Sequence, residues 1–148
     1  MTKIRAAWCL LAFAAVVFAL WQAFEPIESV DLGCAKGSLF AGDGSQTHSC
    51  DDPIWAVEGV FPLLELGVVL AIPPTVAALA MRVWVSFMAV AALVALAAVG
   101  LGHWAGFWIL LLLGGVPMAI AALFIAFAHL GVRARSDAAH SVTELGQA

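Results

Sequence analysis

The chain has 148 residues, of which 64% are hydrophobic and 11% are charged, and its formal net charge at pH 7 is −4. A mean hydropathy of +1.06 lies outside the range of soluble globular domains. Because each membrane-spanning helix needs about 20 apolar residues, the length allows about four spans and one modest loop, which leaves no room for a separate soluble catalytic domain. We therefore expect an all-α integral membrane protein that binds no nucleic acid.

The first apolar run covers residues 6–24 and follows two basic residues, Lys3 and Arg5. Its length matches a single membrane-spanning helix. No A-x-A-like cleavage site precedes the acidic residues that come next, so we interpret the run as a retained span and not as a cleaved secretory signal. Cys9 lies inside this span, where a thiol behaves as a small hydrophobic group.

Residues 25–52 form a polar loop that carries six acidic residues against the single Lys36. The loop also holds Cys34 and Cys50, and on the oxidising side of a membrane we expect them to form a disulfide. Such a bond closes a loop of about 15 residues and contributes about 3 kcal/mol by the chain-entropy estimate. The predicted fold class is a four-transmembrane-helix bundle with one disulfide-stapled extracytoplasmic loop between helices 1 and 2.

The apolar stretch after the loop, up to Leu101, is too long for one span and must fold back on itself. One candidate for the turn is Arg82, but the surrounding AMRVW segment contains no turn residue. The other is Pro73-Pro74, because proline cannot donate a helical hydrogen bond and disfavours the α conformation of the residue before it. We therefore predict a turn at Pro73 and Pro74, a second span over 53–72 and a third over 75–101.

A turn at the two prolines places Glu65 and Arg82 at the same depth in an antiparallel hairpin, about 13 Å from the turn. A lone charge at that depth costs about 2.5 to 3.5 kcal/mol on insertion scales, so we predict an intramembrane ion pair between the two side chains. In the alternative interpretation, the prolines lie within one long helix. Arg82 then reaches the cytoplasmic interface and Glu65 lies nearer the outside.

The fourth span is predicted over 104–132, after a short GLGH turn, and the polar segment 133–148 is predicted to be a cytoplasmic tail that is disordered or docked on a partner. Gly102 and Gly106 form a small-xxx-small motif at the start of this span. Pairs of alanines with the same spacing occur on three spans, and we expect such residues to pack the four helices together. These pairs are Ala15 and Ala19, Ala91 and Ala95, and Ala122 and Ala126.

Basic residues flank both termini, whereas the long loop has one lysine. The positive-inside rule then predicts a multi-pass protein of the cell (plasma) membrane with both termini in the cytoplasm. Tryptophans also fall near the predicted boundaries, as an interfacial aromatic belt requires. Trp21, Trp55, Trp104 and Trp108 are expected near the outer boundary and Trp8 near the inner one.

No residue pattern points to catalysis, a cofactor or a metal site. His48 shares the loop with several aspartates, but no spacing matches a zinc or calcium signature. His129 lies near the end of the fourth span, and no second histidine matches its depth for haem ligation. The topology is similar to that of claudin-like tetraspans. The tryptophans just ahead of a Gly-Leu-Trp and the closely spaced cysteines typical of that family are missing, so the resemblance implies no function or site residue.

Two functional hypotheses remain. The first is a non-catalytic accessory or scaffold subunit of a larger membrane complex, of the respiratory or lipid-transport type, that braces partner helices and presents the acidic loop. Its partners would be other integral membrane subunits and the lipid bilayer. The second is a small homo-oligomeric transporter or channel in which Glu65 is the proton or cation site.

Overall fold

The computed structural model describes residues 2–30, 51–103 and 106–145, with side chains as far as residue 135. In these segments the elements are all helical. They are α1 (Thr2–Phe24), the 3-10 helix η1 (Ile27–Ser29), α3 (Ile54–Val57), α4 (Val60–Ala80), α5 (Val83–Gly102) and α6 (Ile109–Leu145). Four helical segments are long and apolar enough to cross a membrane, namely α1, α4, α5 and residues Ile109–Arg135 of α6.

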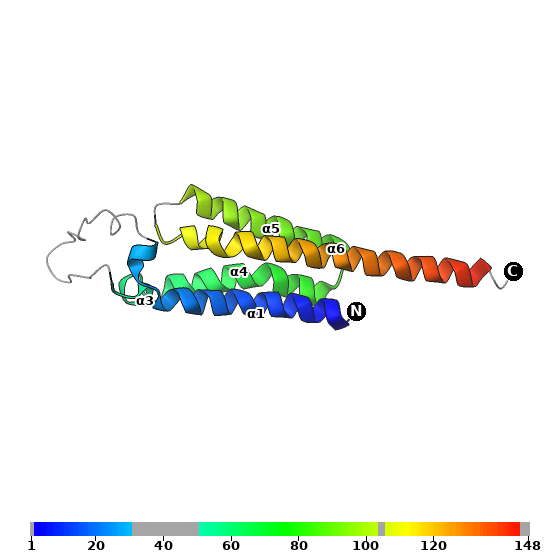
Figure 1. Cartoon of the computed structure of the whole chain (residues 1–148), viewed down its shortest axis with the longest axis horizontal. Coiled ribbons are helices and arrows are strands. Elements are labelled where there is room, and N and C mark those ends of the chain that lie inside the picture. Colours follow the sequence, from blue (N-terminus) through cyan, green and yellow to red (C-terminus); the bar gives the residue numbers. More distant parts are fainter. Residues whose placement is uncertain (1, 31–50, 104–105, 146–148) are drawn as a thin grey trace.

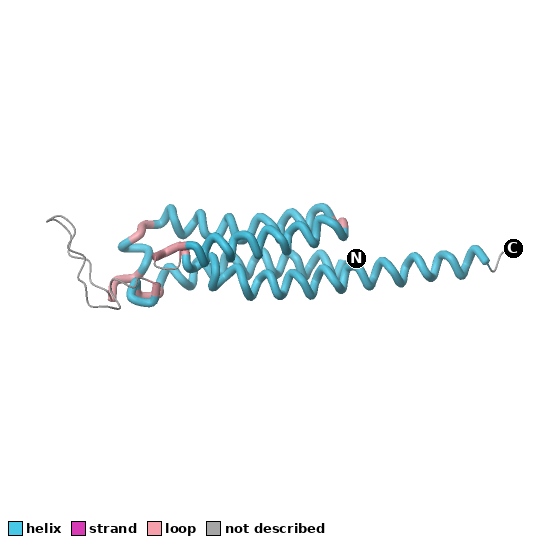
Figure 2. The backbone as a smooth tube through the Cα atoms, turned by 90° about the horizontal axis from the view of Figure 1, so that it is seen from above, coloured by secondary structure: helices cyan, strands magenta, loops and turns pink. Residues whose placement is uncertain are grey.

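The four long helices form an antiparallel bundle in which each runs opposite to the one before it along the chain (Figure 1). The most extensive packing is of α1 on α4 and of α5 on α6, and contacts of α4 with α5 and of α1 with α6 complete the bundle. Both termini lie toward the same end, as the second view also shows (Figure 2), and α3 lies at the opposite end (Figure 1). With 21 residues, α4 is about 31 Å long, which matches a hydrocarbon layer of about 30 Å.

Small residues set the close helix contacts. A Cβ atom added to Gly67 would lie 3.1 Å from the Ala19 Cβ atom, and one added to Gly114 would lie 2.7 Å from the ring of Phe18. Without a hydrophobic force between helices in lipid, such close approach is a main source of packing energy. The alanine prediction is confirmed on two spans, where Ala15, Ala19, Ala122 and Ala126 are buried, and is wrong for Ala91 and Ala95, which are exposed.

The predicted turn at Pro73 and Pro74 is wrong, because both prolines lie inside α4, which continues to Ala80. Both proline rings are buried in the bundle. Membrane-spanning helices tolerate proline, since neighbouring helices and hydroxyl side chains help to satisfy the backbone. The Thr75 hydroxyl donates to the Ala71 carbonyl at 2.7 Å, one residue beyond the Val69 and Leu70 carbonyls that the two prolines leave without a helical donor. The long-helix alternative therefore describes this segment correctly.

The chain turns instead at Met81 and Arg82, between α4 and α5. Met81 adopts the left-handed conformation, with φ 48° and ψ 31°, and its N–H donates to the Ala77 carbonyl to close the last turn of α4. A non-glycine residue in this region is uncommon, which explains why the sequence gives no turn signal here. Arg133 of α6 places Nη2 3.5 Å from the Met81 carbonyl oxygen, so the fourth span supports the turn.

Two backbone hydrogen bonds join the segments on either side of the polar loop. The Ile27 N–H donates to the Asp52 carbonyl and the Ile54 N–H donates to the Glu25 carbonyl, both at 3.0 Å. Ile27 and Ile54 are buried beneath this junction. One turn of helix, α3, follows, and Gly59 with φ 85° then separates it from α4. The second span thus begins at Val60 and not at residue 53.

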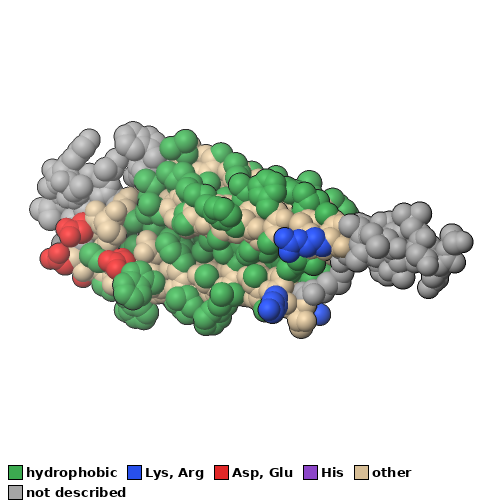
Figure 3. All heavy atoms as spheres, turned by 45° about the vertical axis from the view of Figure 1, so that its right-hand side comes forward, with side chains coloured by type: hydrophobic (Ala, Val, Ile, Leu, Met, Phe, Trp, Pro, Cys, Tyr) green, Lys and Arg blue, Asp and Glu red, His purple; other side chains and the backbone are tan. Residues whose placement is uncertain are grey.

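Charged side chains separate to opposite ends of the bundle (Figure 3). The acidic end, at η1 and α3, carries Glu25, Glu28, Asp51, Asp52 and Glu58. The basic end, at the two termini, carries Lys3, Arg5, Arg82, Arg133 and Arg135. Apart from Glu65, the described surface between the two ends is mainly apolar, as a membrane-crossing bundle requires.

The segment that follows the fourth span differs from the sequence prediction. A disordered or docked tail is predicted after residue 132, whereas α6 continues without a break from Ile109 to Leu145. Its 37 residues make it about 55 Å long, so the helix exceeds the hydrocarbon thickness and extends beyond the bundle at the basic end (Figure 1).

Candidate functional site

Glu65 lies on the outer face of α4, one and a half turns after the helix begins at Val60, which places it about 8 Å along the axis. Its own side chain is exposed. Phe61 and Val68, four residues before and three residues after it on the same face, are 86% and 55% exposed. The buried positions of α4, such as Leu66 and Leu70, lie on the opposite side. The carboxyl group therefore faces the surroundings of the bundle and not its interior.

The predicted ion pair between Glu65 and Arg82 is wrong within one chain. Because α4 is continuous, Glu65 lies about 22 Å along the axis from the end of the helix at Ala80, next to Arg82. Both side chains are exposed, Glu65 toward the acidic end and Arg82 at the basic end. The five basic side chains that the structure describes all lie at the basic end, so none shares the depth of Glu65.

The interior of the described bundle contains two polar side chains, Ser86 of α5 and His129 of α6. The Ser86 Oγ atom lies 3.2 Å from Nδ1 of His129 and 3.4 Å from the Arg82 carbonyl oxygen. The rings of Phe87 and Phe127 meet edge to face between the same two helices, with their centroids 5.8 Å apart. The contact therefore joins α5 to α6 by one polar pair within an apolar interface.

The hydrogen-bonding roles within this pair follow from the single proton on the hydroxyl. If Ser86 donates to the Arg82 carbonyl, it accepts from Nδ1–H, and Nε2 of His129 is a bare acceptor. If Ser86 donates to Nδ1, Nε2 carries the proton. In either tautomer, Nε2 is buried without a hydrogen-bond partner among the described residues. The pair can therefore fix the register of the two helices, while one imidazole nitrogen stays unpaired.

The other histidine whose side chain the structure describes is at the far end of α5. His103 directly follows the last residue of that helix and is exposed, with Nδ1 3.0 Å from the Val99 carbonyl oxygen. His103 and His129 are therefore at opposite ends of the bundle and cannot ligate one group. Within the described residues, no group of three or more His, Cys, Asp or Glu side chains could hold a metal ion.

Trp8 departs from the predicted aromatic belt. Its side chain is fully buried in the bundle, and Nε1 has no hydrogen-bond partner among the described residues. Trp84, at the start of α5, is the exposed tryptophan at the basic end. Trp21 and Trp55 are exposed toward the acidic end, as the belt requires, whereas Trp104 lies outside the described residues.

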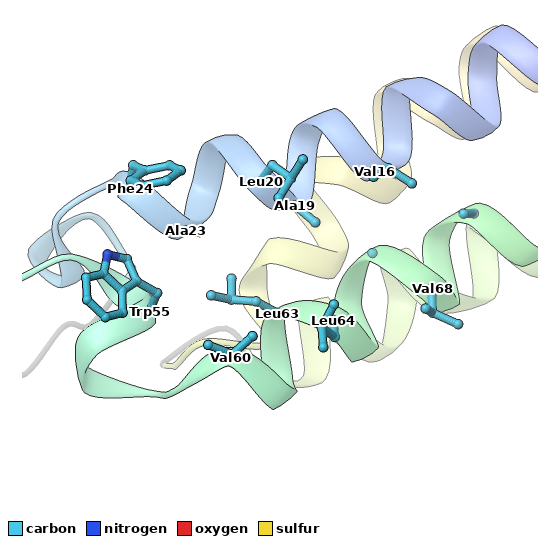
Figure 4. A pocket seen from close by; sticks show the side chains of 12 residues that line it. Val16, Ala19, Leu20, Ala23, Phe24, Trp55, Val60, Leu63, Leu64 and Val68 are labelled. Atoms are coloured by element: carbon cyan, nitrogen blue, oxygen red, sulfur yellow. The ribbon is translucent and has the colours of Figure 1, made fainter.

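An apolar groove separates the outer edges of α1 and α4 near the acidic end (Figure 4). Its volume is about 440 Å³. Phe24 and Trp55 lie at one end of the groove, and Val16 and Val68 lie at the other, on facing helices. The other residues that line the groove are Ala19, Leu20, Ala23, Val60, Leu63, Leu64, Gly67 and Ala71.

The remaining predicted site residues are the two loop cysteines and the Gly102–Gly106 motif. Cys34 and Cys50, with the predicted disulfide, lie outside the described residues, as does His48. Cys9 is a free, exposed thiol on α1. The packing role of Gly102 and Gly106 is wrong, because a Cβ atom added at either would meet nothing within 4 Å. Gly102 ends α5 and Gly106 precedes α6, so the motif does not lie on one helix.

Sequence reasoning missed the groove and the Ser86–His129 contact. The two residues are 43 positions apart, and no spacing rule connects them. A signal was present, since Ser86 is the one polar residue with a side-chain oxygen between residues 83 and 102. A buried hydroxyl in lipid needs a partner, and this requirement points to polar groups on neighbouring spans.

No family model, curated protein or solved structure matches this chain.

Proposed function

We propose that this chain is a non-catalytic accessory subunit of a larger membrane complex, of the respiratory or lipid-transport type, and that it braces a partner helix along the outer face of α4. The observation that carries the proposal is the position of Glu65, which is exposed on that face within a membrane-spanning helix. Intramembrane carboxylates normally face a bundle interior or a polar partner. Within one chain, Glu65 faces neither.

The energetic argument concerns what covers the carboxyl group. A charge in the hydrocarbon costs about 2.5 to 3.5 kcal/mol at the centre of a span on insertion scales. Because Glu65 lies nearer the start of α4 than its centre, the cost of its charge is lower, but this cost still favours a neighbour that donates a hydrogen bond or brings a cation. A helix of another subunit that packs over Phe61 and Ile72 supplies such a neighbour.

The interior of the bundle supports a structural role over transport by a single chain. Among the described residues, Ser86 and His129 are the buried polar side chains, and both belong to one contact between α5 and α6. A transport path across the membrane needs a polar lining along its length. The described interior is otherwise made of apolar side chains.

The charge distribution supports an orientation with both termini in the cytoplasm of a plasma membrane. The positively charged side chains that the structure describes gather at the end of the bundle where α1 begins, and most of the acidic ones gather at the other end, where the described chain stops at Val30 and resumes at Asp51. The positive-inside rule places the basic end in the cytoplasm. The acidic loop, with its predicted disulfide, then lies outside, where an accessory subunit can present it to a partner.

Affinity purification from native membranes in a mild detergent tests the accessory role. We expect another integral membrane protein to co-purify in stoichiometric amount with the parent chain. Glu65→Lys should release this partner, while Arg135→Glu, which reverses an exposed charge at the basic end away from that face, should retain it. A pure, stable homo-oligomer with no second subunit would overturn the proposal.

The second candidate function is a homo-oligomeric transporter, and the same exposed carboxyl group favours it. Copies that pack along α4 would gather their Glu65 side chains at the subunit interface, where each could exchange a proton or a cation. Flux in liposomes tests this candidate directly. Glu65→Gln should abolish proton or cation flux, and equal flux from the variant and the parent would remove the support for transport.

A further inference from the structure

We infer that the groove between α1 and α4 binds an acyl chain of an amine-headed, zwitterionic phospholipid from the membrane leaflet at the acidic end. The groove lies between α1 and α4, beside the outer face of α4 that carries Glu65, and the two surfaces share Val68. Its occupant does not depend on the proposed partner helix. The inference rests on the extent of the groove, its volume, its lining and the charges beside its mouth.

The groove extends over one leaflet of a bilayer. Along α4 it runs from Val60 to Ala71, a rise of about 16 Å. Along α1 it runs from Phe24 at the acidic end to Val16 in the middle of the helix. A hydrocarbon layer is about 30 Å thick, so each leaflet contributes about half of that depth. The groove therefore matches a lipid tail in one leaflet, whereas a partner span would need a surface over the whole thickness.

The volume of the groove suits a single hydrocarbon chain. The groove offers about 440 Å³, within the range of pockets that bind small molecules. A helix can rest on the rim of this groove, but an extended alkyl chain can enter it.

The side chains that line the groove favour an apolar ligand. All 12 lining side chains are apolar or glycine, and they come from α1, α3 and α4. Ala19 and Gly67 pack against each other and hold the two helices close. Larger side chains, among them Leu20 and Leu64, form the walls (Figure 4). A hydrocarbon tail leaves no polar group unpaired in such a groove.

The charges near the mouth select the headgroup. Glu25 directly follows Phe24, and Glu58 lies two positions before Val60, so both acidic residues are close in sequence to groove residues at its acidic end. The described lysines and arginines all lie at the opposite end of the bundle. The negative potential attracts the ammonium group of phosphatidylethanolamine and repels the net negative headgroup of phosphatidylglycerol.

Native mass spectrometry of the purified chain in detergent tests the inference. The probes are phosphatidylethanolamine and phosphatidylglycerol with identical acyl chains, added separately and in competition. We expect the parent chain to retain one phosphatidylethanolamine about tenfold more strongly than phosphatidylglycerol. Glu25→Gln combined with Glu58→Gln should remove this preference, whereas Arg135→Gln at the basic end should leave it unchanged.

A groove-filling substitution tests the location of the bound lipid. Val68 lines the groove and is 55% exposed, while Val94 on α5 is 54% exposed and lies outside it. Val68→Trp should reduce lipid retention by about tenfold, and Val94→Trp should not. Val16→Trp fills the groove from α1 and serves as the second variant if Val68→Trp does not fold, which circular dichroism checks.

Three results would overturn the inference. The first is equal retention of the two lipids by the parent chain. The second is unchanged retention by folded Val68→Trp and Val16→Trp. The third is a groove that a second copy of the chain occupies, detected as a dimer that both tryptophan variants dissociate. None of these results bears on the co-purifying partner, so failure here and failure of the accessory role are distinguishable.

Discussion

Ser86 and His129 form a polar contact between the third and fourth spans, with the hydroxyl oxygen 3.2 Å from Nδ1. Both side chains are buried, and the interface around them is apolar. In lipid, unlike in water, the separated partners have few alternative hydrogen bonds. The contact therefore specifies how α5 and α6 align, and its loss leaves the imidazole with fewer partners in the bundle.

We predict that Ser86→Ala destabilises the bundle by about 1 kcal/mol, because it leaves a buried imidazole nitrogen unpaired. The same substitution in a His129→Leu background should cost less, since no imidazole then remains to be satisfied. Thermal unfolding in detergent of the parent, the two single variants and the double variant gives the coupling energy. Additive effects would show that the contact does not contribute.

The second prediction compares two glycines of α5. A Cβ atom at Gly100 would lie 2.5 Å from the backbone nitrogen of Leu112, whereas one at Gly102 would meet nothing within 4 Å. Gly100→Ala should therefore destabilise the bundle by about 1 to 3 kcal/mol through overpacking against backbone. Gly102→Ala, the control on the same helix, should change stability by less than about 1 kcal/mol. Equal effects in a thermal unfolding series would contradict the close packing of α5 on α6.

The third prediction concerns the turn between the second and third spans. A cysteine in place of Arg82 should react with a membrane-impermeant maleimide, because this residue lies at the end of the bundle. Thr75→Cys should stay protected, since Thr75 lies within α4 and inside the span. Labelling of inverted vesicles but not of right-side-out vesicles would place this turn in the cytoplasm. Labelling of the parent chain is the control for reaction at the native cysteines.

Rapid labelling of Thr75→Cys together with protection of Arg82→Cys would contradict this topology. It would move the turn back to the two prolines and bring Glu65 and Arg82 to the same depth. The experiment therefore also tests whether the intramembrane ion pair is excluded within one chain.

The fourth prediction is the disulfide between Cys34 and Cys50, which lies outside the described residues. The loop begins and ends at a backbone junction between Ile27 and Asp52 and between Glu25 and Ile54. We expect non-reducing mass spectrometry to detect peptides linked through the two cysteines, and reduction to lower the stability by up to about 3 kcal/mol. Finding both thiols free would refute the prediction.

The sequence predicts the number of spans well because that number depends on composition and length alone. The ends of the spans are harder to predict from the sequence. Pro73 and Pro74 strongly disfavour helix in soluble proteins, but in α4 they are buried in a bundle where no water can bond to an interrupted helix backbone. The actual turn at Met81 uses a left-handed methionine, which no turn propensity indicates.

The candidate site follows from the sequence only in part. Glu65 is conspicuous as a carboxyl group within an apolar run, and its importance can be inferred without coordinates. Its partner cannot be inferred in this way, because the predicted ion pair with Arg82 depended on the misplaced turn at Pro73 and Pro74. The groove and the Ser86–His129 contact depend on how helices distant in sequence meet. Such contacts are set by packing and not by a local pattern.

Site-specific photocrosslinking in native membranes tests the central claim, that the outer face of α4 contacts a partner helix. A photoreactive residue at Ile72 shares the face of Glu65, and one at Leu113 of α6 is the control, since both side chains are 52% exposed. Leu113 precedes Gly114, which lies against Leu70, so the two probes also have similar depth. The account predicts that Ile72 crosslinks to another integral membrane protein and that Leu113 crosslinks to lipid alone. Crosslinks from Ile72 to lipid alone would contradict it.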